Sequence, residues 1–124
     1  MIDSHCHLTD NYEDIGAVIS AAQQAGVSHF LNIGCMYHEW QPCIACIEQY
    51  PAVFGAVGLH PEVELEEIDH LDEISSFLNH SKMVALGEIG LDYVCADMPK
   101  ERQRALFERQ IQIALSHHMP VIIH

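Results

Sequence analysis

Positively charged side chains are scarce in this sequence. Five of its 124 residues are Lys or Arg, against 18 Asp or Glu, and the formal net charge is −13. Proteins that bind nucleic acid through a basic surface need Lys and Arg to displace the counterions of the phosphates, so this balance argues against that class. It leaves open phosphate chemistry in which metal ions supply the positive charge.

Long hydrophobic runs are also missing. No stretch approaches about 18 uninterrupted apolar residues, and no basic segment precedes the first apolar run, so we predict neither a membrane span nor a signal peptide. The hydrophobic share is nevertheless 49%. A chain of this length and composition can bury the core of one globular domain.

A paired cysteine framework is absent too. The cysteines are five in number and scattered, as expected in a reducing compartment, and we predict a cytoplasmic location. Cys43 and Cys46 have the spacing of redox and zinc motifs, but no second pair accompanies them and the surrounding pattern is helical. We therefore predict that these two are buried helix cysteines.

Short apolar runs that read as β-strands alternate with segments of helical periodicity. The predicted strands span residues 1–7, 27–33, 53–59, 83–87 and 121–123. The predicted helices span 14–25, 39–50 and 99–117, with another ending near 78 behind an acidic, solvated segment at 62–73. The last helix has an apolar stripe that we expect to face inward: Phe107, Ile111, Ala114 and Leu115. Alternating strands and helices predict a parallel sheet with right-handed crossovers.

The positions of polar residues distinguish between the two large parallel folds. No Gly-x-Gly-x-x-Gly follows the first strand, so an open dinucleotide-binding sheet lacks its phosphate turn. Four polar residues stand at the carboxyl ends of different strands: His7, His60, Glu88 and His124. A barrel brings such ends around one pocket. The predicted fold class is α/β, an incomplete (β/α)8 TIM-type barrel with five parallel strands and four crossover helices.

Five strands cannot close an eight-stranded barrel. We therefore expect residues 1–124 to form a single domain, the N-terminal part of a barrel truncated after its fifth strand. Either the coding sequence continues, or the open sheet edges support self-association with another chain.

Two histidines end the first predicted strand. Because side chains alternate along a strand, His5 and His7 face one way and Cys6 faces the other. Two such imidazoles can hold one divalent ion at about 2.0–2.1 Å. In a chain with ten histidines the pair can also arise by chance, but later strands also end in His or Glu.

Four motifs together resemble a known family. They are Ile-Asp-Ser-His-Cys-His at 2–7, Gly-Leu-His-Pro at 58–61, Val-Ala-Leu-Gly-Glu-Ile-Gly-Leu-Asp-Tyr at 84–93 and Met-Pro-Val-Ile-Ile-His at 119–124. In order and spacing they resemble the N-terminal five-eighths of the TatD-family metal-dependent deoxyribonucleases, a branch of the amidohydrolase-like metal barrels. The third motif is the most specific.

This resemblance implies that residues 1–124 are the N-terminal part of a metal-dependent hydrolase barrel. It further implies cleavage of DNA phosphodiester bonds with two divalent metal ions, either Zn²⁺, Mn²⁺ or Mg²⁺. It implies that His5 and His7 bind the first ion, that Glu88 bridges both ions as the catalytic carboxylate, and that His124 binds the second. His60 would face the substrate phosphate. DNA is thus the implied substrate partner, and no membrane partner is implied. The family's further ligands, a histidine of the sixth strand and an aspartate of the eighth, lie beyond these five strands.

Other interpretations remain. The same ligands can serve a related barrel that acts on amide, lactone or small phosphoester bonds, and the fragment can be a non-catalytic metal-binding module. Asp92 is either a turn residue or a support for a ligand. Six histidines are predicted to be solvated or satisfied outside the site: His29, His38, His70, His80, His117 and His118. Four basic residues of one helix are predicted to form a solvated face: Lys100, Arg102, Arg104 and Arg109.

Overall fold

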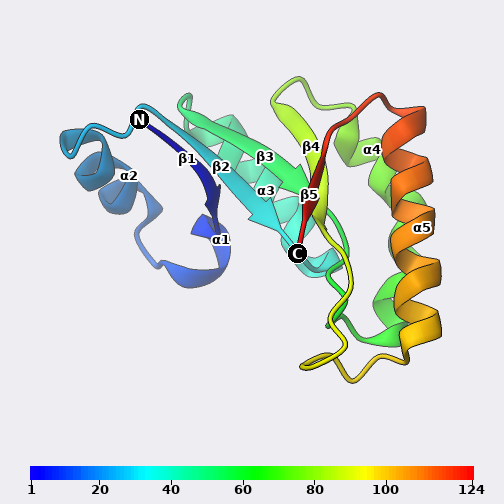
Figure 1. Cartoon of the computed structure of the whole chain (residues 1–124). Helices are drawn as coiled ribbons and strands as arrows, with labels where there is room; N and C mark the ends of the chain where they lie inside the picture. Colours follow the sequence, from blue (N-terminus) through cyan, green and yellow to red (C-terminus); the bar gives the residue numbers. More distant parts are fainter.

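The sheet has five parallel strands in chain order and is curled into part of a barrel (Figure 1). This computed structural model describes residues 1–124, with side chains described for all except residues 10 and 11. The strands are β1 (Ile2–Cys6), β2 (His29–Gly34), β3 (Val53–Val57), β4 (Met83–Ile89) and β5 (Val121–Ile123). Each strand is followed in the chain by its parallel neighbour, so each connection must cross over on the same side of the sheet. A barrel of the predicted type has this arrangement. The predicted fold class is confirmed.

The crossovers are helical, and they pack on the outer face of the curl. The helices are α1 (Leu8–Asn11), α2 (Ile15–Gln24), α3 (Tyr37–Gln49), the 3₁₀ helix η1 (Leu65–Glu73), α4 (Ile74–Leu78) and α5 (Lys100–Ser116). Figure 1 shows α3 behind β2 and β3, and α5 on the far side of β4 and β5. The acidic segment forms η1, and α1 is an addition to the four predicted helices. Among the described residues, no helix combines the length and apolar character needed to cross a bilayer.

The sheet is buried on both faces in its middle. On the outer face, Trp40 and Ile47 of α3 are fully buried in a cluster that includes Val57 and Leu86. On the inner face, a smaller cluster holds Ile33, Cys35, Ala56 and Ala85. This explains the nearly continuous apolar character of the third predicted strand, because a strand covered on both faces cannot alternate with polar residues.

The inward face of α5 differs from its prediction. Leu115 is 62% exposed, and the buried positions are Leu106, Ala114 and two glutamines, Gln103 and Gln110. Ala114 is buried as predicted, and Phe107 and Ile111 are partly buried against the core, so the prediction is wrong only for Leu115. It also missed the two glutamines, because an apolar pattern does not include polar residues. Both glutamines are 1% exposed, so their amides need hydrogen-bond partners inside the protein.

Each buried glutamine clamps the main chain where a strand has just ended. Gln110 accepts from the N–H of Leu59 at 2.8 Å and donates to its carbonyl at 2.9 Å. Gln103 accepts from the N–H of Asp92 at 2.9 Å, and its amide nitrogen donates to the carbonyls of Asp92 at 2.8 Å and Met98 at 2.9 Å. Main-chain groups that have left the strand ladder are satisfied in this way. Helix α5 therefore fixes the loops that follow β3 and β4.

We expect Gln110→Ala to lower the free energy of unfolding by about 2–4 kcal/mol, because two buried main-chain groups of Leu59 lose their partners. Urea denaturation followed by circular dichroism measures the change. Gln112→Ala is the matched control, since Gln112 is exposed on the same helix and its loss should cost less than about 0.5 kcal/mol. Equal losses in the two variants would contradict the clamp.

The prediction for Cys43 and Cys46 is confirmed, since both are buried in α3. Burial raises the pKa of the Cys43 thiol to about 12, so it stays protonated and unreactive at neutral pH. We expect iodoacetamide at neutral pH to modify the exposed Cys95 and to spare Cys43 and Cys46 until the protein is unfolded. Mass spectrometry of the alkylated protein identifies the sites, and early labelling of Cys43 would be inconsistent with this packing.

Candidate metal centre

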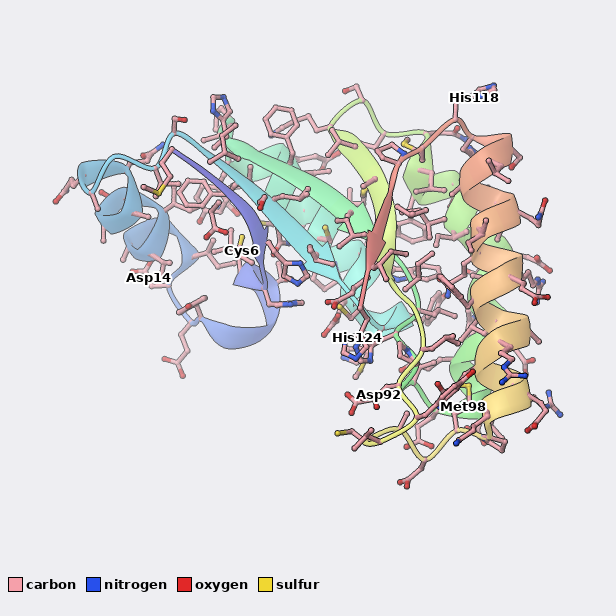
Figure 2. The ribbon with its side chains drawn as sticks, viewed as in Figure 1. Cys6, Asp14, Asp92, Met98, His118 and His124 are labelled. Carbon is pink, nitrogen blue, oxygen red and sulfur yellow. The ribbon has the colours of Figure 1, made fainter. Side chains whose placement is uncertain are left out.

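The carboxyl ends of the strands carry the candidate ligands to one rim of the sheet. Figure 2 shows His124 and Asp92 at this rim, with His118 at the opposite end. Strands β1 and β4 are separated by two others, so a flat sheet would hold them about 14 Å apart. The curl and the reach of the side chains bring Nε2 of His5 to 3.1 Å from Oε2 of Glu88.

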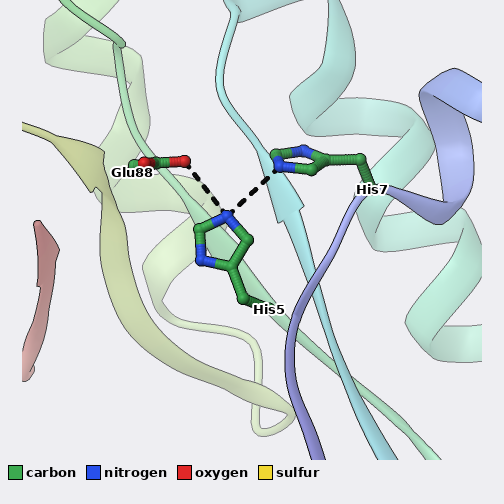
Figure 3. Close-up of side chains that lie close together, drawn as sticks. All are labelled: His5, His7 and Glu88. Carbon is green, nitrogen blue, oxygen red and sulfur yellow. Dashed lines mark hydrogen bonds and ion pairs between the residues drawn. The ribbon is translucent and has the colours of Figure 1, made fainter. Parts of the chain in front are cut away.

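The first group of converging side chains is His5, His7 and Glu88 (Figure 3). The Nε2 atoms of His5 and His7 lie 3.2 Å apart. The side chain between them, Cys6, points away, and its thiol donates to the carbonyl of Leu31 at 3.2 Å. The alternation along the strand therefore places the two imidazoles together, as the sequence predicted.

The second group contains His60, Glu88 and His124. Nδ1 of His124 lies 3.1 Å from Oε1 of Glu88 and 2.9 Å from Nε2 of His60. Glu88 thus turns Oε2 towards the first group and Oε1 towards the second. Its side chain is only 13% exposed. One carboxylate joins two sets of donor atoms.

The donor atoms of each group suit a divalent cation. Within each group they all lie within 4.8 Å of one another. Two ligands held about 2.0–2.1 Å from one ion in tetrahedral or octahedral directions are roughly 2.8–3.4 Å apart, and the separations of 3.1 and 3.2 Å fall in this range. Imidazole with carboxylate is a donor set for Zn²⁺ or Mn²⁺, and for Mg²⁺ with additional water.

Hydrogen bonds assign the proton positions of the two histidines of the second group. Nδ1 of His60 accepts from the N–H of Glu62 at 3.2 Å, which in a neutral ring leaves the proton on Nε2. Burial, together with the charge of His124, lowers the pKa of His60 and favours that neutral ring. With its proton on Nε2, His60 donates to Nδ1 of His124 at 2.9 Å, so Nδ1 is the unprotonated nitrogen that can bind an ion. Nε2 of His124, on the other side of the ring, lies 3.6 Å from Oδ2 of Asp92.

Asp92 has both of the roles that the sequence left open. Its Oδ1 accepts from the N–H groups of Val94 and Cys95 at 2.8 Å each, and these bonds hold its pKa below the usual range. Its Oδ2 faces His124. It is a turn residue and also a support for a candidate ligand. Together with Glu62 and Cys95 it forms a third set of nearby donor atoms, but its Oδ1 is already engaged in the turn.

The two groups border a cavity of about 400 Å³ at this rim. His7, His60, Glu88 and His124 line it, and two residues that the sequence did not single out, Cys35 and Glu39, line it as well. The thiol of Cys35 lies 3.9 Å from Oε2 of Glu88. The sequence offers only the position of Cys35 directly after a strand as an indication of this contact.

The six histidines predicted to lie outside the site are absent from both groups. His38, His70 and His80 each lie near a glutamate. Nε2 of His117 lies 3.0 Å from the hydroxyl oxygen of Ser75. His5, His7, Glu88 and His124, the four residues predicted to be ligands, do meet at one rim, and His60 lies beside them. No described residue brings in a ligand from elsewhere in the chain.

Known proteins resemble this chain along its whole length. It is 32% identical to the uncharacterised metal-dependent hydrolase YabD of Bacillus subtilis, matching 100% of this chain and 50% of that protein. It is also 32% identical to the 3′-5′ ssDNA/RNA exonuclease TatD of Salmonella typhimurium, with 100% and 49% matched. The crystal structure of YjjV, a TatD homologue from Escherichia coli K12, superposes with a TM-score of 0.83 at 30% identity, covering 100% of this chain and 50% of that one.

The chain therefore spans about half the length of the curated relatives that it matches. The solved homologue agrees with the parallel, curled sheet found here. The family model described as TatD related DNase matches residues 2–124, which is nearly the whole chain. This chain belongs to the family of TatD-related DNases.

Proposed function

We propose that this chain provides the first half of a metal-dependent hydrolase site that cleaves phosphodiester bonds of DNA with two divalent ions. The single observation that carries the proposal is the placement of Glu88, whose two oxygens face different groups of histidines. The name of the Salmonella relative, a 3′-5′ ssDNA/RNA exonuclease, supports a nucleic-acid strand as the substrate. The names of other relatives support a metal-dependent hydrolase more generally.

The ligand assignment follows from the two groups. His5, His7 and Oε2 of Glu88 would hold one ion, and Oε1 of Glu88 with Nδ1 of His124 would contribute to holding the other. When bound, two divalent ions supply the Lewis acidity that activates water and stabilises charge on the attacking and leaving oxygens. The largely buried position of Glu88 limits access of bulk water, so its charge acts at a lower effective dielectric constant.

The remaining side chains of the rim orient the substrate and the ligands. A proton on Nε2 of His60 makes that nitrogen a hydrogen-bond donor, which suits an anionic phosphate oxygen better than a cation. Asp92 would keep the other nitrogen of His124 protonated and so direct Nδ1 towards the second ion. Gln103 and Gln110 hold the loops on which Asp92 and His60 stand.

The direct test is hydrolysis of 5′-labelled single-stranded DNA by the purified protein with Mn²⁺ or Mg²⁺. We expect shortened strands with metal and none with EDTA. Amide, lactone and small phosphoester substrates should be assayed in parallel. Turnover of an amide or a lactone without turnover of DNA would overturn the proposal, and metal binding without any turnover would favour the non-catalytic interpretation.

We expect Glu88→Gln to reduce hydrolysis by at least about a hundredfold, because Glu88 would contact the ions directly. Loss of a residue that only hydrogen-bonds to a metal ligand already lowers activity or metal affinity 10- to 100-fold. The amide keeps the size of the side chain, so the melting temperature should change little. Glu48→Gln is the control, because Glu48 is an exposed carboxylate near the opposite rim, paired with His80. Normal activity of Glu88→Gln would remove Glu88 from the mechanism.

Metal stoichiometry tests the two groups separately. We expect calorimetric titration with Zn²⁺ or Mn²⁺ to give two ions per chain, and His124→Ala to give one, because the first group stays intact. His38→Ala, a change at an exposed histidine outside both groups, should retain two. A single ion in the unmodified chain, or loss of both ions with His124, would be inconsistent with separate groups joined by Glu88.

A further inference from the structure

Three side chains beside the candidate metal centre form a compact cationic and aromatic surface, the Tyr93 cluster, made of Tyr93, Lys100 and Arg104. The Nζ of Lys100 lies 4.8 Å from the centre of the Tyr93 ring, and Cζ of Arg104 lies 5.8 Å from it. Nε of Arg104 also donates to the Tyr93 hydroxyl at 2.8 Å. The ring thus holds two positive charges together on the surface.

The charges of this cluster are unusual for such an acidic chain. Neither Lys100 nor Arg104 forms an ion pair with a carboxylate among the described residues, although the chain has 18 acidic side chains. By contrast, Arg109 on the same helix pairs with Asp72 at 2.6 Å. Both cluster cations are exposed, and Tyr93 is 39% exposed. Glu101 and Glu108 act on Arg104 electrostatically but form no ion pair with it, so both cations remain available to an anion.

The cluster is fixed relative to the candidate metal centre. Tyr93 follows Asp92, whose Oδ2 lies 3.6 Å from His124. Gln103, which lies between Lys100 and Arg104 in α5, clamps both main-chain groups of Asp92. Figure 2 shows that Asp92 and Met98, at the start of α5, lie at the same end of the molecule as His124. Lys100 and Arg104 are exposed, as the predicted solvated face requires, and they also meet Tyr93 of the loop that follows β4.

We propose that the Tyr93 cluster binds a backbone phosphate of single-stranded nucleic acid, next to the phosphodiester at the metal centre. This inference rests on the proposed function and deepens it, because it assigns a second contact to the substrate strand. An ammonium and a guanidinium both bind phosphate oxygens through charge-assisted hydrogen bonds. The cluster supplies locally the positive charge that the composition lacks overall. A small phosphoester at the metal centre would not reach this contact, whereas a strand would.

Salt-dependent binding provides the primary test. Fluorescence anisotropy measures the affinity of the chain for a labelled dT12 oligonucleotide with EDTA present, so that no hydrolysis is needed. Each phosphate contact on a single strand contributes about 0.7 to the slope of log K against log salt concentration. We expect Lys100→Ala/Arg104→Ala to remove one such contact, reducing that slope by about 0.7 and weakening binding about fivefold near 0.1 M salt.

A second double variant controls for net charge. Arg102→Ala/Arg109→Ala removes the same two charges from the same helix, but from the side on which these arginines border Ile68. Its slope should stay that of the unmodified chain. Arg104→Lys keeps the charge and should retain most of the binding. Circular dichroism melts confirm that each variant is folded. Equal slopes in the two double variants, or no measurable binding by the unmodified chain, would overturn the inference.

Kinetics distinguish this inference from the proposed function. With metal present, Lys100→Ala/Arg104→Ala should raise KM for the oligonucleotide about fivefold, while kcat/KM for bis(p-nitrophenyl) phosphate stays within about twofold. If the cluster only held the loop in place, both substrates would be affected equally, and the inference would fail. If neither substrate is hydrolysed by the unmodified protein, the proposed function fails, and the binding measurement still decides on the cluster.

Discussion

Two hydrogen-bond clamps on α5 determine where the rim of the sheet carries its functional groups. A side-chain amide has one acceptor and one donor face, which match the N–H and C=O of a peptide unit. Gln110 therefore satisfies Leu59, just before His60, and Gln103 satisfies Asp92, four residues after Glu88. Strand ends lose their ladder partners, so without such groups the loops would need water or new contacts. The buried face of α5 thus positions the loop that carries His60 and the loop that carries Asp92, which faces His124.

The order and direction of the strands follow from the sequence because burial on both faces leaves a distinct pattern. Residues 53–59 read as apolar throughout, and the structure buries β3 from the helices outside and a small cluster inside. The inward face of α5 could not be read in this way. Gln103 and Gln110 are buried for their hydrogen bonds, which depend on main-chain atoms of distant loops, and Leu115 is left exposed.

The meeting of His5, His7, Glu88 and His124 at one rim could be predicted because each stands at or near the end of a strand, and parallel strands end at a common rim. The different hydrogen-bond partners of His60 and His124 could not be predicted from the sequence. The difference rests on the N–H of Glu62 facing Nδ1 of one ring and the carboxylate of Asp92 facing Nε2 of the other. The pairing of Lys100 and Arg104 with Tyr93 was also hidden, because helical periodicity does not show which exposed side chains meet a loop.

The contact between His5 and Glu88 spans two intervening strands, so it depends on how strongly the sheet is curved. The shape of the sheet and the occupancy of the first ligand group are thermodynamically linked: whatever flattens the sheet separates the ligands, and an ion held between them resists flattening to the same extent. Packing on the outer face of the sheet, such as that around Trp40, would therefore help to set the affinity for an ion at this group. An ion bound there would act as a tie across the concave side of the sheet.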